Sequence, residues 1–280
     1  MLEQQPSRTA FAAAAHRAAH QLLERGAIFK DPLALAILGQ DAETVARDAE
    51  ADPARTGMRA FIAARSHFAE GALAAGVAAR GVRQLVVLGA GLDTLAYRHA
   101  LGDGLRVFEV DHPATQAWKR RRLGEAGIPV PSDLVFAPVD FERAGLLDGL
   151  TAAGFDPQQR SFFIWLGVVP YLTEAAVVST LAVIAGVPGG AEVVFDYADP
   201  PSALSQPQLA LHEARAARVA ALGEPWLSYF EATSLHPRLR ALGFVTVEDL
   251  GPRDLAARYW RGAASRTPER GGHVLLAATV

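Results

Sequence analysis

The feature that most constrains this chain is a run of four apolar residues, Leu85 to Leu88, that leads directly into Gly89-Ala90-Gly91. An uninterrupted apolar run of this kind is typical of a strand that is buried on both faces of a parallel sheet. The glycines carry no Cβ, so they permit a sharp turn and a close approach of the backbone to a ligand. A doubly wound α/β sheet opens its nucleotide site with such a strand and turn.

The glycine pattern is incomplete as a dinucleotide-binding fingerprint. Thr94 stands where that fingerprint has its third glycine, which permits close packing of helix on strand. An ordinary tight turn between strand and helix is the alternative interpretation. The pattern still predicts a nucleotide-type ligand. Because the third glycine is missing, it argues against an NAD-dependent oxidoreductase, which we keep only as a weaker enzyme hypothesis.

The next apolar, β-branched segment, residues 105–111, ends in acidic side chains. Asp111 follows Gly91 by about 20 residues, the spacing expected of a carboxylate that accepts the hydroxyl groups of a ribose. Glu109 is a second candidate for the same role, since residues two apart lie on one face of a strand. Either acid could instead only cap a helix that begins near Pro113. The sequence leaves these alternatives open.

Strand and helix patterns alternate from Gln84 onward, which predicts a mostly parallel sheet with helices on both faces. Strands are expected near 84–88, 105–110, 134–138, 161–166, 191–197, 243–250 and 273–280. Helices are expected near 93–101, 113–126, 142–153 and 173–186. No clear helix separates the last two strands. The fold class is therefore α/β, a doubly wound, mostly parallel seven-stranded sheet whose C-terminal strand is an antiparallel edge.

Two helical regions flank this alternation within a single expected domain, residues 1–280. Residues 1–80 predict a helical N-terminal cap, and residues 199–240 predict a helical insertion before the sixth strand. The Rossmann-like core would then comprise 84–198 and 241–280. Because the insertion follows the carboxyl end of a strand, it lies on the ligand side of the sheet and could act as a lid. A packing helix without ligand contact is the alternative.

Composition narrows the functional classes. The formal charge of −3 gives no electrostatic reason to expect nucleic acid, and the basic run Lys119 to Arg122 is interpreted as a solvated helix face.

The chain has no cysteine, which excludes disulfides and thiolate catalysis and fits a cytoplasmic protein. His16 and His20 have helical spacing but no carboxylate nearby in sequence, so no metal site is expected. No apolar run is long enough to span a bilayer, and the oligomeric state is not indicated.

Several blocks in order resemble the leucine carboxyl methyltransferase-like superfamily of class I S-adenosylmethionine-dependent enzymes, and in particular its bacterial branch linked to secondary metabolism. The resemblance covers nearly the whole chain. The blocks are Arg8-Thr9-Ala10, Phe29-Lys30-Asp31-Pro32-Leu33-Ala34, Val87 to Arg98, Phe108 to Pro113, Val139-Asp140-Phe141 and Trp165 to Thr173. The resemblance implies a methyltransferase that uses S-adenosylmethionine and acts on a small-molecule acceptor, by O-methylation of a carboxylate or a phenol.

The resemblance also implies roles for individual residues. Gly89, Ala90 and Gly91 would form the turn against the methionine part of the cofactor, and Asp111 would hold the ribose hydroxyls. The adenine would contact Asp140 and Phe141, which follow the third strand.

Arg65, in the Arg65-Ser66 pair, would bind the methionine carboxylate, because the guanidinium fork matches a carboxylate in two hydrogen bonds. Arg59 is close enough in sequence to be the alternative match.

One position departs from the family pattern. Leu166 lies at the cofactor position where the leucine carboxyl methyltransferases carry a glutamate, which argues against methylation of a protein phosphatase and for another acceptor. A carboxylate or phenolate acceptor can arrive ionised and needs no strong base. The candidates for the catalytic pocket are Tyr171, Tyr197 and His212, with Glu213 and Trp226 beside them. The missing acid also keeps open a non-catalytic binding or scaffold protein.

Overall fold

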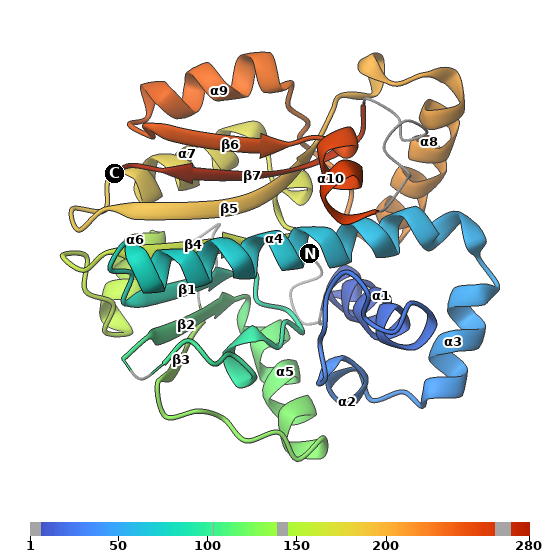
Figure 1. Cartoon of the computed structure of the whole chain (residues 1–280), viewed down its shortest axis with the longest axis horizontal. Helices are drawn as coiled ribbons and strands as arrows, with labels where there is room; N and C mark the ends of the chain where they lie inside the picture. Colours follow the sequence, from blue (N-terminus) through green and yellow to red (C-terminus); the bar gives the residue numbers. More distant parts are fainter. Residues whose placement is uncertain (1–6, 103, 139–144, 261–269) are drawn as a thin grey trace.

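A computed structural model describes residues 7–102, 104–138, 145–260 and 270–280 of the chain. Within these residues, one seven-stranded sheet has the order β3-β2-β1-β4-β5-β7-β6 (Figure 1). The strands are β1 Gln84–Leu88, β2 Arg106–Asp111, β3 Leu134–Pro138, β4 Ser161–Trp165, β5 Ala191–Ala198, β6 Thr246–Leu250 and β7 Gly272–Ala278. Strands β1 to β5 pair in parallel, and β7 pairs antiparallel with both β5 and β6. The predicted class, a doubly wound and mostly parallel α/β sheet, is confirmed.

Helices cover both faces of the sheet and the ends of its strands. They are α1 Arg8–Leu23, α2 Ala34–Leu38, α3 Ala42–Glu50, α4 Thr56–Ala79, α5 Pro113–Glu125, α6 Leu146–Ala152, α7 Glu174–Ala185, α8 Gln206–Ala221, α9 Ala232–Ala241 and α10 Pro252–Tyr259. Short 3-10 turns are η1 Pro53–Arg55, η2 Leu95–Tyr97, η3 Val169–Tyr171 and η4 Pro201–Ala203. No helix in the described ranges is long and apolar enough to cross a membrane.

Two apolar layers hold the helices against the sheet. On one face α4 and α10 contribute Phe68, Leu73 and Leu255 to a core with β1 and β4. On the other face α6, α7 and α9 pack on Phe108, Phe163 and Phe195, together with other apolar residues of the strands. Because the strands between these layers are apolar on both faces, their buried runs predicted a sheet covered on both sides.

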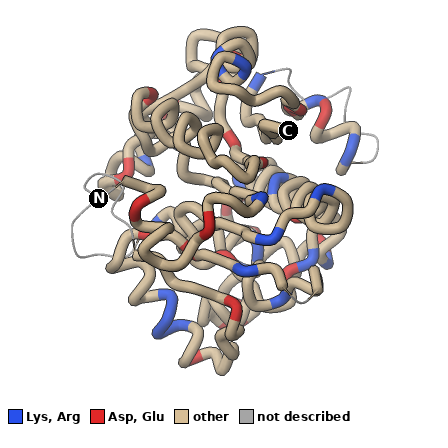
Figure 2. Tube along the Cα trace, turned by 90° about the vertical axis from the view of Figure 1, so that its left-hand side faces the viewer, with Lys and Arg blue, Asp and Glu red and all other residues tan. Residues whose placement is uncertain are grey.

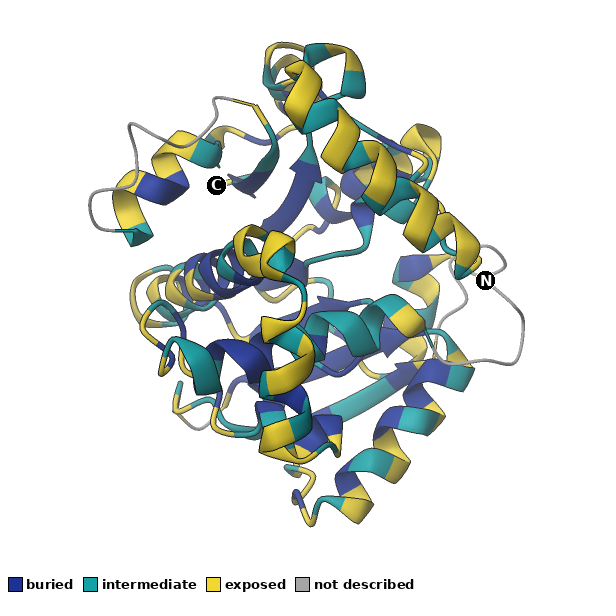
Figure 3. Cartoon of the chain, turned by 90° about the vertical axis from the view of Figure 1, so that its right-hand side faces the viewer, coloured by how far each residue is buried: buried dark blue, intermediate teal, exposed yellow. Residues whose placement is uncertain are grey.

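The helical cap lies beyond the carboxyl ends of the parallel strands, where α1, α2 and α3 gather, with α8 close by (Figure 1). The strand order reverses direction between β1 and β4, and in such sheets ligands bind in the crevice outside the carboxyl ends at this point. Helix α8 has no buried residue and shows mostly exposed and half-buried positions (Figure 3). Lys, Arg, Asp and Glu occur along the whole trace, with both signs interspersed (Figure 2).

Four expectations about elements need correction. The helix expected near 93–101 is only the short turn η2. The side chain of Asp93 accepts the Leu95 N–H at 2.8 Å, and such local side-chain bonds compete with the backbone hydrogen bonds of an α-helix. Helix α10 separates β6 from β7, where no helix was expected, and α3 and α9 were expected only as part of the helical cap and the helical insertion, not as separate helices. Strand β7 is antiparallel as expected, but the edge of the sheet is β6, whose residues alternate in exposure whereas β7 is largely buried.

Candidate cofactor site

The turn after β1 is shaped by two glycines in the left-handed backbone region. Gly89 has φ +65° and Gly91 has φ +44°, which L side chains rarely adopt. A Cβ at Gly89 would lie 2.4 Å from the side chain of Val168, and one at Gly91 would lie 2.9 Å from the Cβ of Ala10 in α1. Helix α1 of the cap is therefore packed directly on the turn. A side chain at either glycine would obstruct the packing around the turn.

Asp111 ends β2 and faces this turn. Its Oδ2 accepts the Gly91 N–H at 2.6 Å, and its Oδ1 accepts the His112 N–H at 2.7 Å. Burial raises the pKa of Asp111 against the lowering effect of these two N–H groups. Each carboxylate oxygen has two lone-pair sites, so both oxygens keep a site for a further donor such as a ribose hydroxyl.

Glu109, the competing acid, is occupied by partners of its own. It accepts from Lys119 Nζ at 2.7 Å and from the Tyr97 hydroxyl at 3.0 Å, and both charged side chains are almost fully buried. Burial raises the pKa of Glu109, and the charge of Lys119 opposes that rise. The interpretation of Lys119 as part of a solvated face was wrong, because its ammonium neutralises a buried carboxylate. Asp111 is the acid that faces the glycine turn.

Arg65 extends from α4 to the ends of β4 and β5. Its Nη1 donates to Asp196 Oδ2 at 2.6 Å, and Asp196 Oδ1 accepts the Gly167 N–H at 2.5 Å. Gly167 has φ +71°, and a Cβ there would lie 2.8 Å from Nη2 of Arg65. The Nε of Arg65 is buried and has no partner among the described residues. An unpaired buried donor of this kind is costly unless a ligand supplies the acceptor.

Arg59, the alternative to Arg65, is engaged elsewhere. It forms a bidentate pair with Glu24 at the end of α1, with Nε to Oε2 at 2.9 Å and Nη2 to Oε1 at 2.5 Å. Its Nη1 is buried without a partner in the described chain. Of the two arginines, Arg65 is the one that reaches the carboxyl ends of β4 and β5.

A buried polar cluster that sequence patterns did not suggest ties the cap to the turn. Asp31 accepts from Arg17 at 3.2 Å and from the Thr94 hydroxyl at 2.8 Å. Arg17 also donates to the Leu92 carbonyl at 2.5 Å. Thr94 therefore stands in the place of a third glycine as a buried anchor for the helical cap. The block around Asp31-Pro32 was the only signal available for this cluster.

The insertion contacts both η3 and the start of α1. The carboxylate of Glu224 accepts the N–H groups of Arg8 and Thr9 at 3.2 and 3.0 Å. The Leu227 N–H donates to the Pro170 carbonyl at 2.6 Å. An acid is favourable at a helix N-terminus, where N–H groups lack partners within the helix. Glu224 thus holds the insertion against the cap. No sequence pattern indicated this residue.

Two of the candidate catalytic residues lie at this insertion, Tyr171 in η3 against it and His212 within it. Tyr171 ends η3, and burial raises the pKa of its hydroxyl, an effect that the nearby Trp226 and Thr9 side chains oppose. His212 in α8 contacts the Tyr229 hydroxyl at 3.1 Å and the ring of Trp226 at 5.2 Å. Burial lowers the pKa of His212.

Other predicted residues do not join this group. Tyr197 is buried in β5, where its hydroxyl donates to Asp249 of β6 at 2.5 Å and its ring stacks on His273 at 4.7 Å. Glu213 is exposed. Leu166 follows β4 and is half-buried against the core. Asp140 and Phe141 lie outside the described residues.

Comparison with known proteins identifies the family of the chain. The family model for leucine carboxyl methyltransferase matches residues 10–185. The chain is 39% identical over 179 residues to "Putative S-adenosyl-L-methionine-dependent methyltransferase YktD" of Bacillus subtilis (strain 168), covering 62% of this chain and 58% of that protein. It is 44% identical over 96 residues to a similarly named protein of Mycobacterium tuberculosis (strain ATCC 25618 / H37Rv), covering 34% of this chain and 31% of that protein. The matches thus span well under two thirds of these relatives.

A solved structure shares the fold. The crystal structure of a "putative methyltransferase" from Thermobifida fusca YX aligns with a TM-score of 0.59 at 15% identity, covering 98% of this chain and 94% of that chain. At this identity the likeness concerns the fold alone, and it supports the class I, Rossmann-like arrangement of the sheet.

Proposed function

The chain belongs to the leucine carboxyl methyltransferase family of S-adenosylmethionine-dependent methyltransferases, and from this premise we propose that it methylates an oxygen atom of a small-molecule carboxylate or phenol. One observation carries the proposal. The glycine turn follows β1, Asp111 ends the neighbouring strand β2, and Arg65 extends from α4 to Asp196 of β5, so the three groups lie near the carboxyl ends of strands around the switch point of the sheet. Together they offer a Cβ-free backbone surface, a hydroxyl acceptor and a carboxylate donor.

These residues fit the parts of S-adenosylmethionine, which supplies an electrophilic methyl group on a positively charged sulfur. Asp111 would accept from the ribose hydroxyls with the lone pairs that Gly91 and His112 leave free. Arg65 would donate Nε to the methionine carboxylate while Asp196 holds its Nη1. Gly89, Ala90 and Gly91 would line the methionine part, Leu166 would lie beside it, and Asp140 with Phe141 would contact the adenine.

The side chains near the crevice suit an acceptor that is already ionised. Burial keeps Tyr171 protonated by raising its pKa, and burial lowers the pKa of His212. Leu166 supplies no acid where the family pattern has one. We therefore assign the protein the tasks of holding the acceptor in line and excluding water, without a strong general base. Tyr171 and His212 would orient the acceptor.

Two measurements test the proposal in sequence. Calorimetry should detect binding of S-adenosylhomocysteine and no binding of NAD at the same concentrations. Incubation with methyl-deuterated S-adenosylmethionine and a panel of carboxylic and phenolic acceptors should then give labelled esters or ethers by mass spectrometry. Binding of NAD in place of S-adenosylhomocysteine would overturn the assignment in favour of the oxidoreductase.

The alternative function is a non-catalytic binding or scaffold protein with a methyltransferase fold. The observation that favours it is the apolar Leu166 in place of an acid. It predicts tight binding of S-adenosylhomocysteine with no labelled product from any acceptor in the panel.

A further inference from the structure

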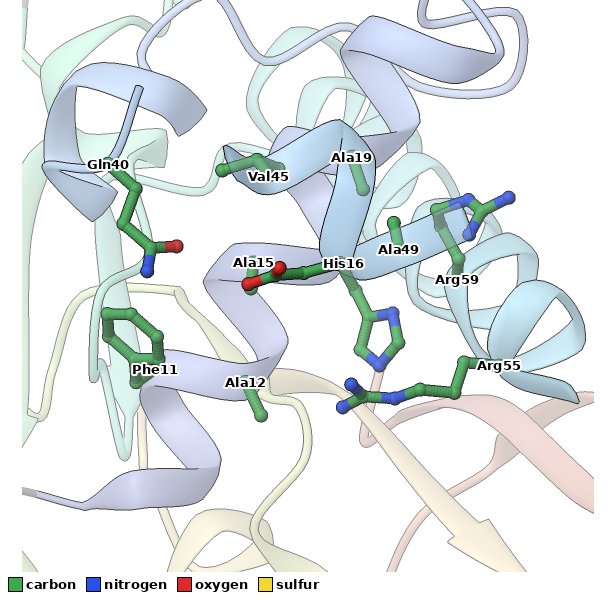
Figure 4. Close-up of a pocket in the computed structure, with 11 residues that line it drawn as sticks. Phe11, Ala12, Ala15, His16, Ala19, Gln40, Val45, Ala49, Arg55 and Arg59 are labelled. Carbon is green, nitrogen blue, oxygen red and sulfur yellow. The ribbon is translucent and has the colours of Figure 1, made fainter. Parts of the chain in front are cut away.

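A separate cavity of about 190 Å³ lies inside the helical cap, between α1, α3 and the start of α4 (Figure 4). Its polar lining consists of His16, Gln40, Asp48, Arg55 and Arg59, and its apolar lining consists of Phe11, Ala12, Ala15, Ala19, Val45 and Ala49. None of these residues belongs to the glycine turn, to β2 or to the Arg65–Asp196 pair.

Helix α1 separates this cavity from the proposed cofactor site. Ala10 contacts Gly91, and Arg17 donates to the Leu92 carbonyl, so these residues mark the face of α1 that lies on the turn. Ala12 and Ala19 line the cavity, and at about 100° per residue they lie roughly 180–200° around the helix from Ala10. The cavity is thus on the opposite side of α1 from the turn.

One end of the cavity is positively charged. The side chain of Arg55 has no hydrogen-bond or ion-pair partner in the described part of the chain, and it points toward the ring of His16 (Figure 4). Arg59 also lines the cavity, and its buried Nη1 lacks a partner there. Burial, together with the charges of the arginines around it, lowers the pKa of His16 to about 3, so its imidazole is neutral at physiological pH. Two guanidinium groups without full pairing favour an anionic group at this end.

The other end differs in chemistry. Gln40 lies across the cavity from Arg55 (Figure 4), and the exposed carboxylate of Asp48 also lines the cavity. Asp48 repels a second anionic group and attracts a hydrogen-bond donor. Between the two ends, the methyl groups of Ala12 and Ala15 and the ring of Phe11 form an apolar wall. The cavity is somewhat larger than the apolar cavities of about 150 Å³ that bind benzene in other proteins, so it suits a single-ring molecule.

We propose that this cavity is a second ligand site, which binds a small organic acid with a hydroxyl group at its far end. The carboxylate pairs with Arg55 beside the free Nη1 of Arg59, the apolar body lies against α1, and the hydroxyl group donates to Asp48. This inference goes beyond the proposed function, because it concerns the cavity behind α1 and does not involve methyl transfer.

Calorimetry on the full chain with 4-hydroxybenzoate tests the site, with two matched compounds that each lack one end. Benzoate lacks the hydroxyl group and should bind at least threefold more weakly, and 4-hydroxybenzyl alcohol lacks the acid and should bind at least tenfold more weakly. Saturation with S-adenosylhomocysteine should change the Kd for 4-hydroxybenzoate less than threefold. No binding of 4-hydroxybenzoate, equal binding of the alcohol, or displacement by S-adenosylhomocysteine would each overturn the proposal.

Variants locate the site. Arg55→Met should weaken binding of 4-hydroxybenzoate at least tenfold, whereas Arg240→Met, which alters an exposed arginine of α9 outside the cavity, should leave it unchanged. Ala15→Leu should also abolish binding, because it fills the apolar part of the cavity without a change in charge. An unchanged Kd in both Arg55→Met and Ala15→Leu, with unfolding temperatures like that of the parent protein, would place the ligand elsewhere.

Discussion

Arg65 is held on one side and unpaired on the other. Its Nη1 is bound to Asp196, and its buried Nε has no partner among the described residues. A guanidinium that is oriented before the ligand arrives loses less conformational entropy on binding. If Arg65 binds the methionine carboxylate as proposed, Asp196 would fix the geometry of that contact together with Arg65.

Asp196→Asn should raise the KM for S-adenosylmethionine about tenfold, because the amide no longer fixes the charged fork of Arg65. The expected change in kcat is small, since Asp196 would not touch the reacting atoms. Glu192→Gln is the matched control. It removes another buried acid of β5, one that pairs with Arg80 at the far end of α4. Both variants should lower stability, and an equal effect of both on KM would show that Asp196 acts only through folding.

Asp111→Ala should weaken binding of S-adenosylhomocysteine by about 1–3 kcal/mol, which is about 5- to 150-fold in Kd. The reason is that ribose hydroxyls would lose their acceptor in a largely buried site, where Asp111 is 9% exposed. Calorimetry on the variant measures the change, with Asp133→Ala, in the loop before β3, as the control. An unaltered affinity would mean that the ribose is held elsewhere.

At the scale of elements, helix α1 is the part of the cap that connects the proposed sites. One face packs on Gly91, the opposite face lines the cavity, and its first turn is capped by Glu224 from the insertion. Because the contact to Glu224 is a single carboxylate on two backbone N–H groups, it can open without disturbing the core. We propose on this basis that α8, within the insertion of residues 199–240, acts as a lid on a single domain of residues 1–280, while α9 stays packed on the sheet.

Glu224→Gln should loosen this closure and destabilise the first turn of α1 by about 0.5–1 kcal/mol, since a neutral amide interacts less well with the helix N-terminus. Hydrogen exchange of the amides of Arg8 and Thr9 should become faster. Glu231→Gln serves as the control, because Glu231 precedes α9 without a side-chain cap bond. Exchange rates that match those of the parent protein would contradict a latch at Glu224.

The outer strands carry a second buried polar element. His273 of β7 lies between Asp249 of β6 at 3.1 Å and Asp199 after β5 at 3.3 Å. Burial alone would lower the pKa of His273, but hydrogen bonds to Asp199 and Asp249 raise it to about 9. Tyr197 is part of this cluster, which explains why it does not reach the crevice.

This cluster predicts a loss of stability at alkaline pH. The folded pKa of His273, about 9, lies above the ordinary value of 6.5, so its stabilising contribution is complete below the ordinary value and is lost as pH rises through about 9. Urea unfolding at pH 6.5, 8 and 9.5 should show that decline. His273→Gln should be less stable at pH 6.5 and should decline less with pH. His212→Gln, outside the cluster, should keep the slope of the parent protein, and the same slope in His273→Gln would contradict this account.

At the scale of the whole molecule, the cap, the insertion and the strand ends surround the crevice, so a ligand there would contact several elements at once. Binding to the folded state alone stabilises a protein by about 2.7 kcal/mol at a ligand concentration of 100 Kd. S-adenosylhomocysteine should accordingly raise the unfolding temperature by about 5–10 °C. NAD at equal concentration should cause no shift, and Asp111→Ala should reduce the shift. Differential scanning fluorimetry measures all three, and a shift with NAD alone would contradict the assignment of the crevice.

The sequence by itself determined the features that depend on local patterns. The apolar run before Gly89 predicted a buried central strand, and the acid that ends the next strand predicted a carboxylate at the same edge, as found for Asp111. The alternation of strands and helices predicted the fold class. Each depends on side-chain periodicity or on backbone freedom within a short segment, which the folded chain preserves.

Only the tertiary structure decided which distant groups meet. The partner of Arg65 is 131 residues away, that of Thr94 is 63 residues away, and those of Arg8 and Thr9 are more than 200 residues away. A buried acid such as Asp196 is expected to pair with a cationic side chain. Which arginine forms that pair depends on how α4 lies against the sheet. The pairing of Glu109 was likewise decided by the position of Lys119 on α5, which leaves Asp111 as the acid that faces the glycine turn. The physical reason is that burial and charge pairing are properties of the packed molecule, whereas the sequence specifies them only through the fold.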